Sequence, residues 1–215
     1  NTFAMWKGNG MVREIFRTRN MRNLTGNAGI AHVRYPTAGS ATNPEEAQPF
    51  YVNAPFGITL GHNGNLTNAE QLKSEMFRID RRHINTTSDS EVLLNVLAHE
   101  LQEQSSSVTL DPATIFRAVA GLHRRVGGAY ACVAHIAGHG ILAFRDLYGI
   151  RPLCYGISET EGGTEYLVAS ESVALEGLGF RFVRDVGPGE AIFIDLDGNF
   201  HAQQCAQDVS LNPCI

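Results

Sequence analysis

The sequence predicts an α+β fold. Short apolar runs typical of strands lie in two groups, over residues 29–62 and 129–204, and the main helix signals lie between the groups. Strict alternation of strands and helices would indicate a parallel sheet, whereas segregated strands and helices indicate an α+β arrangement. With 215 residues, the chain is long enough to form one well-packed domain.

The helices are predicted from the residues that begin them. Segments 67–70 (Thr-Asn-Ala-Glu) and 88–91 (Ser-Asp-Ser-Glu) have the spacing of a capping box, in which a hydroxyl and a carboxylate accept the first backbone N–H groups. Asp111 before Pro112 gives an N-cap followed by a proline at the first helical position. Apolar residues at helical spacing follow each signal, and a shorter helix is expected over residues 171–178.

The strands are predicted from apolar runs that are bounded by turn-forming residues. They are expected at residues 29–34, 58–62, 129–136, 141–145, 153–157, 166–169, 182–185, 191–195 and 200–204. The second of these stops just before Asn63-Gly64, because an Asn-Gly pair is typical of a tight turn or a left-handed residue. Asp197-Gly198 is a clear hairpin signal between the last two strands.

The composition excludes several classes of protein. Hydrophobic residues make up 43% and charged residues 18%, a balance that supports a packed core and excludes a disordered chain. Seventeen basic residues against 22 acidic ones leave a net charge of −5, so we expect no nucleic-acid partner. No apolar stretch is long enough to predict a membrane span. Four widely spaced cysteines indicate free thiols in a reducing, cytoplasmic compartment and no metal site.

The first candidate functional segment surrounds Arg34. This arginine ends an expected strand just before a segment rich in turn formers and small residues. Such an arginine can bind a carboxylate through two parallel hydrogen bonds, and the segment after it has the composition of a mobile lid. A structural ion pair between Arg34 and a nearby aspartate is the alternative, and the sequence leaves both interpretations open.

The second candidate segment is Asn63-Gly64. A side-chain amide next to a glycine backbone N–H provides two converging hydrogen-bond donors, which is one way to build an oxyanion hole. The alternative is an ordinary turn that links the strand before it to the helix that follows. An Asn-Gly pair alone does not distinguish the two.

The third candidate is Asp89, in the first turn of an expected helix. A carboxylate there can cap the helix and suits the positive end of the helix dipole, and both are structural roles. The same carboxylate could bind a substrate ammonium group. Elsewhere, Arg145, Asp146 and Arg151 are interpreted as a salt-bridged turn, and His99, His123, His135 and His139 as ordinary core or surface histidines.

Taken together, these segments resemble the glutaminase domain of amidophosphoribosyltransferases, a branch of the class II glutamine amidotransferases. The motifs that carry the resemblance are HVRYPTAG (32–39), EAQPF (46–50), HNGNLTN (62–68), HINTTSDSE (83–91), GAYAC (128–132), GIRPL (149–153) and ASES (169–172). The resemblance extends over essentially all of the chain. Residues 86–91 of the HINTTSDSE motif help to distinguish this branch from the glucosamine-6-phosphate synthase branch, which is expected to have a Thr-Asp-Thr-Glu-like sequence there.

The resemblance implies a fold and a set of roles. The fold is a four-layer αββα sandwich of the N-terminal-nucleophile hydrolase type. Arg34 is expected to bind the α-carboxylate of glutamine and Asp89 its α-ammonium group. The Asn63 side chain and the Gly64 backbone N–H are expected to form the oxyanion hole. Tyr35, Thr37 and Gly39 are expected to belong to a mobile glutamine loop.

The resemblance also raises expectations about what lies outside residues 1–215. The family's nucleophile is an N-terminal cysteine whose own α-amine serves as the base, and no cysteine of this chain stands in a matching position. We therefore expect a domain truncated at its N-terminus, with no cofactor of its own and inactive alone. A phosphoribosyltransferase domain, with phosphoribosyl pyrophosphate and Mg²⁺, is expected downstream.

The full-length protein is expected to form a homo-oligomer, without a membrane partner. Two other functions stay open at this stage. The chain could be the glutaminase domain of another class II amidotransferase, or a glutamine-binding module without catalytic activity.

Overall fold

The computed structural model describes residues 2–34 and 44–212. The helical elements are α1 (Val12–Ile15), α2 (Thr18–Met21), the 3-10 helix η1 (Pro44–Glu46), α3 (Ala69–Glu75), the π-helix η2 (Met76–Asp80), α4 (Asp89–Gln104), α5 (Pro112–Arg125) and α6 (Ser172–Gly177). The strands are β1 (Phe50–Val52), β2 (Ile58–Leu66), β3 (Gly128–Ile136), β4 (Gly140–Arg145), β5 (Cys154–Thr160), β6 (Gly163–Ala169), β7 (Arg181–Asp185), β8 (Glu190–Asp195) and β9 (Phe200–Gln204).

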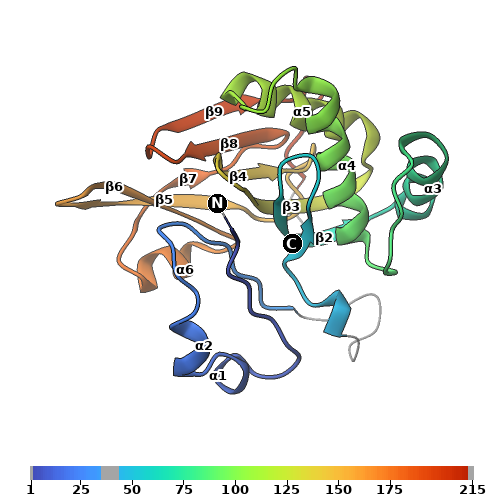
Figure 1. Ribbon diagram of the computed structural model, residues 1–215. Coiled ribbons are helices and arrows are strands. Elements are labelled where there is room, and N and C mark those ends of the chain that lie inside the picture. Colours follow the sequence, from blue (N-terminus) through green and yellow to red (C-terminus); the bar gives the residue numbers. More distant parts are fainter. Residues whose placement is uncertain (1, 35–43, 213–215) are drawn as a thin grey trace.

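The described strands form two antiparallel sheets (Figure 1). The larger sheet has the order β1-β2-β3-β4-β8-β9, and the smaller has the order β6-β5-β7. The longest ladder joins β2 to β3, from Ile58 opposite Ile136 to Leu66 opposite Gly128. This ladder sets the position of every residue of β2, including the predicted site residues.

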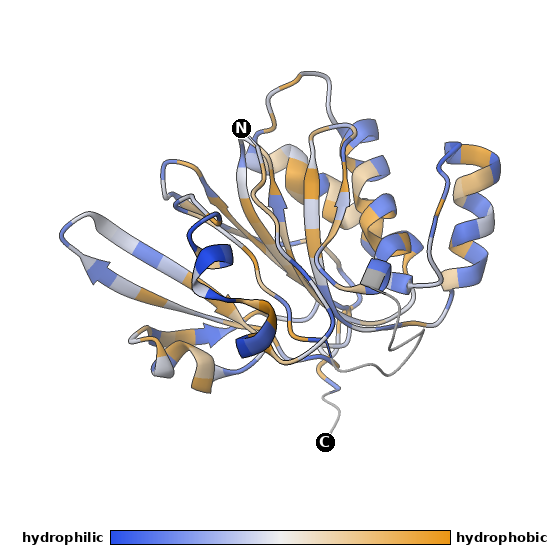
Figure 2. Cartoon of the chain, turned by 60° about the horizontal axis from the view of Figure 1, so that its bottom comes forward, coloured by the Kyte–Doolittle hydropathy of each residue, from blue (hydrophilic) through white to orange (hydrophobic). Residues whose placement is uncertain are grey.

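Helices α4 and α5 cover one face of the larger sheet (Figure 1). Apolar residues concentrate in these two helices and in the strands beneath them (Figure 2). Helix α4 is buried on most of its circumference because it contacts β1, β2, α3 and α5. Ser88 caps α4 by accepting the N–H of Ser90, and Asp111 caps α5 by accepting the N–H of Thr114 at 2.6 Å. Both predicted helix starts are confirmed. The capping box predicted at 88–91 is wrong, because the Glu91 carboxylate accepts the N–H groups of Asn85 and Thr86 instead.

The second face of the larger sheet packs on the smaller sheet. Between the sheets lies an apolar cluster to which Ala131 and Ile192 contribute from one side and Tyr155 from the other. Side chains alternate along a strand, so Gly156 faces away from the larger sheet, and there it meets Leu175 of α6. The layers are therefore helices, sheet, sheet and helix, and the α+β prediction with its αββα layering is confirmed.

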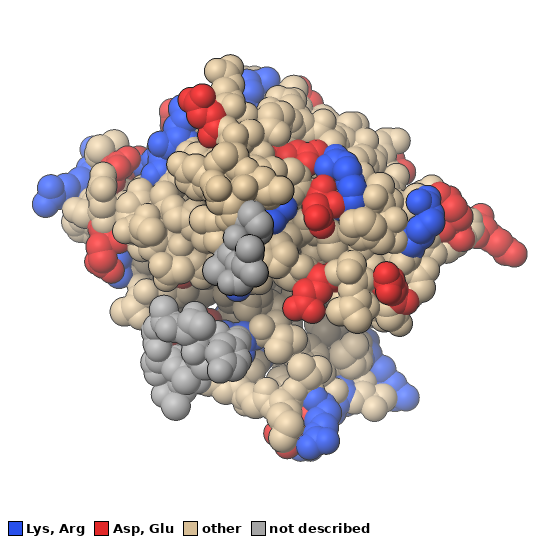
Figure 3. Space-filling view, turned by 180° about the vertical axis from the view of Figure 1, so that it is seen from behind, with Lys and Arg blue, Asp and Glu red and all other residues tan. Residues whose placement is uncertain are grey.

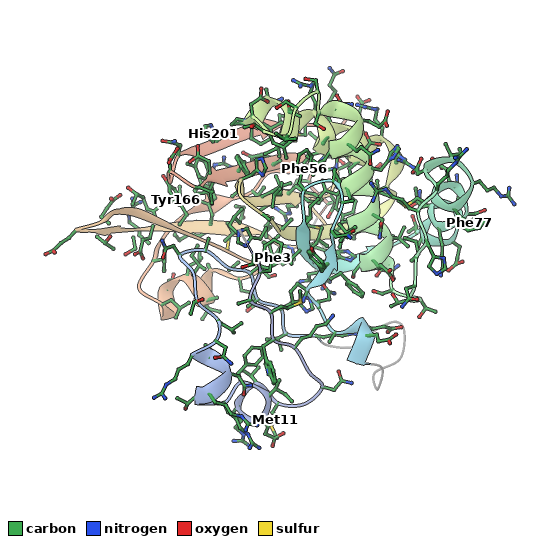
Figure 4. All side chains as sticks on the ribbon, viewed as in Figure 1. Phe3, Met11, Phe56, Phe77, Tyr166 and His201 are labelled. Atoms are coloured by element: carbon green, nitrogen blue, oxygen red, sulfur yellow. The ribbon has the colours of Figure 1, made fainter. Side chains whose placement is uncertain are left out.

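The N-terminal residues, with α1 and α2, lie on the side of the sheets away from α5 (Figure 1). Phe3 anchors this segment because its ring packs edge-on against Tyr51 and His135 (Figure 4). At the other side of the molecule, Phe77 of η2 projects outward and is 67% exposed (Figure 4). The face drawn in Figure 3 carries basic and acidic side chains interspersed. Within the described ranges, no helix is both long and apolar enough to cross a membrane.

Three other predictions about the helices and strands are wrong. Residues 29–34 pair with no described strand. They lie over the face of β2 instead of beside its edge, and the His32 side chain is 3.8 Å from the point where a Cβ atom on Gly61 would stand. Strand β2 does not stop at residue 62 but runs on to Leu66, because pairing with β3 outweighs the local turn preference of Asn-Gly. Thr67 does not cap α3. The N-cap residue is Asn68, whose side chain instead bonds the backbone of the α5–β3 connection.

Candidate active site

The predicted site residues gather where the end of β2 meets the start of α4. Asn63 and Gly64 belong to β2, and Asp89 is the first residue of α4. Arg34 approaches this region from the N-terminal segment, and Arg151 approaches it from the loop between β4 and β5. The β2–β3 ladder holds Asn63 and Gly64, and the capped helix holds Asp89, on regular secondary structure.

Gly64 has a conformation that only glycine adopts readily, with a φ of +153° inside a strand. A Cβ atom at this position would overlap the carbonyl oxygen of Ala129 and would stand 2.8 Å from Nε2 of His62. The strand can therefore pass this point only with glycine. The left-handed residue that Asn-Gly predicted is present, although the turn is not.

The hydrogen-bonding direction of Gly64 follows from strand alternation. On β2 the N–H groups of His62 and Leu66 point away from β3, because they donate to Oε1 of Gln48 at 2.6 Å and to Oδ2 of Asp89 at 2.9 Å. Every second residue of an antiparallel strand points to the same side, so the N–H of Gly64 lies between these two on the same edge. Among the described residues it has no side-chain acceptor. It is thus a backbone donor available to a ligand.

The Asn63 side chain is oriented by an arginine. Its Oδ1 accepts hydrogen bonds from Nε of Arg151 at 3.1 Å and from Nη2 at 2.5 Å. The amide nitrogen is therefore turned away from the guanidinium. Asn63 lines a cavity of about 90 Å³ between the two sheets, together with Ala169 and Ser170.

Asp89 is held at the helix start but stays partly accessible. Its Oδ2 accepts the N–H of Leu66, and its Oδ1 lies 3.9 Å from Nδ1 of His62. The side chain is 19% exposed, and the N-terminus of α4 favours its negative charge. Ser88 rather than Asp89 caps the helix, so the capping part of the structural alternative is wrong and the dipole part stands. Its carboxylate can therefore face a cation.

Arg34 forms an ion pair with a glutamate. Its Nη2 lies 3.0 Å from Oε2 of Glu46, which is buried, and the other oxygen of Glu46 accepts the hydroxyl of Thr87 at 2.8 Å. The structural alternative correctly expected an acidic partner, although the partner is a glutamate. Through Glu46 and Thr87, Arg34 is tied to the segment that carries Asp89.

A buried network behind the site was not predicted. Nδ1 of His62 lies 3.0 Å from the hydroxyl of Ser90, and Gln48 donates to that hydroxyl and to the His62 carbonyl oxygen. Burial lowers the pKa of His62, and the Asp89 carboxylate opposes the shift only in part. The imidazole is therefore neutral at neutral pH. The position of His62 beside Asn63 in one motif was the available signal.

The described cysteines do not resemble nucleophiles. Cys132, Cys154 and Cys205 are all buried and free. Burial raises the pKa of each thiol, to about 12 for Cys205, whereas a nucleophilic cysteine needs a lowered pKa. Cys214 lies outside the described residues. The site therefore offers hydrogen-bond donors and charged side chains, without a nucleophilic thiol among the described cysteines.

Most of the sequence matches a known domain. Residues 38–177 match the family described as "Glutamine amidotransferase domain", which is well over half of the chain. The chain belongs to the glutamine amidotransferase domain family. It is 56% identical to the amidophosphoribosyltransferases of Pasteurella multocida, over 215 residues, and of Escherichia coli, over 216 residues. Both alignments cover 100% of this chain and 42% of the relative, so the chain spans less than half of these relatives.

A solved structure supports the same assignment for this glutamine amidotransferase domain. It is the glutamine phosphoribosylpyrophosphate amidotransferase of Bacillus subtilis complexed with ADP and GMP. The match has a TM-score of 0.76 and 28% identity, and it covers 95% of this chain and 41% of the other. The predicted N-terminal-nucleophile hydrolase fold is thereby confirmed.

The structure brings some predicted residues of the glutamine amidotransferase domain together and leaves others aside. Asn63, Gly64 and Asp89 lie around one end of β2. Arg34 is linked to them indirectly, because its partner Glu46 accepts a hydrogen bond from Thr87, two residues before Asp89. The predicted loop residues Tyr35, Thr37 and Gly39 lie outside the described residues. The predicted salt bridge in the turn after β4 is wrong, because Asp146 accepts backbone N–H groups and Arg145 donates to backbone carbonyls.

Proposed function

We propose that this domain binds glutamine and helps to release ammonia from its side-chain amide. The observation that carries the proposal is the pairing of two donors, the Asn63 side-chain amide and the Gly64 N–H, at the end of β2. Hydrolysis of an amide places negative charge on the carbonyl oxygen in the transition state. Two fixed donors at that oxygen stabilise the transition state more than the substrate, which is what raises kcat.

The rest of the site suits the amino-acid end of glutamine. Glutamine is a zwitterion, so it needs a cationic partner for its α-carboxylate and an anionic partner for its α-ammonium group. Arg34 supplies the first and the partly exposed Asp89 supplies the second. The α-carboxylate either displaces Glu46 from Arg34 or shares the guanidinium with it. The nucleophile comes from a cysteine that is not among the described residues.

For the whole enzyme, we propose the reaction of an amidophosphoribosyltransferase. Ammonia attacks C1 of phosphoribosyl pyrophosphate, pyrophosphate leaves, and 5-phosphoribosylamine forms for purine synthesis. The resemblance and the 56% identity to amidophosphoribosyltransferases support this proposal. The resemblance favours Mg²⁺ bound with phosphoribosyl pyrophosphate, in the phosphoribosyltransferase part of such an enzyme. The same resemblance supports a homo-oligomer, and the free cysteines support a cytoplasmic location.

Replacing Arg34 by alanine tests the glutamine site. In the intact enzyme, R34A is expected to lower kcat/KM for glutamine at least 100-fold, because removing one partner of a desolvated charge pair costs about 3–5 kcal/mol. Activity with free ammonia is expected to stay close to that of the wild type, since ammonia needs no carboxylate contact. Both activities are measured as glutamine-dependent and ammonia-dependent formation of phosphoribosylamine.

Two controls accompany this measurement. R82A removes an arginine that bonds Gln102 on the exposed surface and should change neither activity. The thermal midpoints of R34A and wild type show whether the loss of the Glu46 partner unfolds the domain. If glutamine-dependent and ammonia-dependent rates fall equally in a folded R34A variant, Arg34 is only structural and the proposed glutamine site is wrong.

A further inference from the structure

An asparagine side chain can act as an oxyanion donor only if its amide is turned the right way. One end of the amide is a carbonyl oxygen that only accepts, and the other is an NH₂ group that only donates. If the Asn63 amide were reversed, it would present an oxygen lone pair to a developing negative charge and would raise the barrier. Some group must therefore fix this orientation before the substrate binds.

Arg151 fixes it. The guanidinium of arginine has donors and no acceptor, and two of its N–H groups, on Nε and Nη2, converge on the Asn63 side chain at 3.1 and 2.5 Å. A reversed amide would place its NH₂ group against both donors, with no hydrogen bond and with repulsion of like partial charges. The orientation with Oδ1 on the arginine is therefore imposed by chemistry, and the NH₂ group is left for a ligand.

The loop that carries Arg151 is held from its N–H side by Asp146. Asp146 is completely buried and accepts the N–H groups of Tyr148, Ile150 and Arg151, at 2.9, 3.1 and 3.3 Å. A buried carboxylate surrounded by backbone donors is a rigid centre for a tight loop. The backbone position of Arg151 is thus set by a carboxylate whose hydrogen bonds within the described residues all come from main-chain N–H groups.

The same loop is held from its carbonyl side by Arg145. Arg145 is buried and donates to the carbonyl oxygens of Gly149 and Arg151, each at 2.6 Å, and to that of Val186 at 2.8 Å. These three hydrogen bonds of the Arg145 guanidinium all go to main-chain carbonyl oxygens. The Arg151 guanidinium, in contrast, donates to the Asn63 side chain.

We propose that Arg151 is a positioning residue for the oxyanion hole. It acts through Asn63, by holding the amide so that its NH₂ group faces the reacting carbonyl oxygen. The proposal rests on the proposed glutaminase function, and it concerns the same site. It predicts that loss of Arg151 harms the transition state rather than the binding of glutamine.

The test compares single variants in the intact enzyme with glutamine as substrate. R151M keeps the length of the side chain and removes its donors, and it is expected to lower kcat at least 10-fold, with KM within about two-fold, as for an interaction made only in the transition state. R151K keeps the charge and a donor group without the planar fork of the guanidinium, and it is expected to recover part of the loss. Ammonia-dependent activity should be unchanged. R184M, which removes an arginine of β7 that pairs with Glu190, is the matched control and should leave all rates unchanged.

A double-mutant cycle with N63A decides how Arg151 acts. If Arg151 works through Asn63, R151M has little further effect in the N63A background, so the combined effect is far smaller than the product of the single effects. If R151M lowers kcat by the same factor with and without Asn63, Arg151 acts directly or through folding, and the proposal is overturned. Equal losses of glutamine-dependent and ammonia-dependent activity in R151M overturn it as well.

Failure of the Arg151 role can be distinguished from failure of the proposed glutaminase function. If N63A and R34A reduce glutamine use as expected but the cycle shows independent effects, only the role of Arg151 is wrong. If N63A leaves kcat for glutamine unchanged, the oxyanion assignment is wrong and the role of Arg151 falls with it. Thermal midpoints of all variants, measured first, separate both outcomes from unfolding.

Discussion

Replacing Asn63 by alanine is expected to lower kcat for glutamine hydrolysis by about 10² to 10³, the loss found when one oxyanion donor is removed. The hydrogen bond from the amide NH₂ group to the substrate carbonyl oxygen becomes strong only when negative charge develops on that oxygen. KM should therefore change far less than kcat. Steady-state kinetics of the intact enzyme with glutamine measure both constants. Free ammonia should support the wild-type rate in the same variant.

The stability of N63A needs its own measurement, because Asn63 accepts two hydrogen bonds from Arg151. Its removal leaves a guanidinium without that acceptor, and the thermal midpoint will show whether the domain tolerates this. A raised KM with an unchanged kcat in a stable N63A variant would mean that Asn63 binds the ground state. The oxyanion assignment would then be wrong.

Replacing Gly64 by alanine is expected to have a still broader effect. The new Cβ atom would overlap the carbonyl oxygen of Ala129, and a φ of +153° is strained for any residue with a side chain. Relief requires β2 to shift from β3, which displaces the Gly64 N–H and the neighbouring Asn63 together. We expect glutamine hydrolysis to fall at least 100-fold, and the free energy of unfolding to fall by about 1–3 kcal/mol from backbone strain alone.

Gly61 offers a matched control on the same strand. A Cβ atom there would meet the nearest side chain, Val133, at 3.5 Å, which is an ordinary contact. G61A should therefore fold and hydrolyse glutamine much as the wild type does. Calorimetry and glutamine kinetics of G61A and G64A side by side test the prediction. Similar stability and activity for the two variants would contradict the geometry assigned to Gly64.

The fold could be predicted wherever local signals agreed with long-range pairing. Ser88 and Asp111 cap their helices as expected, because a cap is a contact within three residues and needs no knowledge of the fold. Strand β2 shows the opposite case. Its Asn-Gly pair favours a turn locally, yet nine residues of the strand pair with β3, and the ladder prevails.

The site could be predicted only in part for the same reason. Asn63, Gly64 and Asp89 lie in motifs with recognisable chemistry, and the structure places them near one another. Arg151 stands 88 positions from Asn63 in the sequence, so nothing local links the two. The motif that contains Arg151 contributed to the resemblance. Its contact with Asn63 forms only when the two sheets pack together, so the sequence alone could not predict it.

The most direct test of the glutaminase assignment is a crystal structure of the intact enzyme with the product glutamate bound. We expect the α-carboxylate to contact Arg34 and the α-ammonium group to contact Asp89. We also expect one γ-carboxylate oxygen to lie within about 3.2 Å of both the Asn63 amide nitrogen and the Gly64 backbone nitrogen. Glutamate bound elsewhere, or bound with its γ-carboxylate away from Asn63 and Gly64, would contradict the assignment of this site.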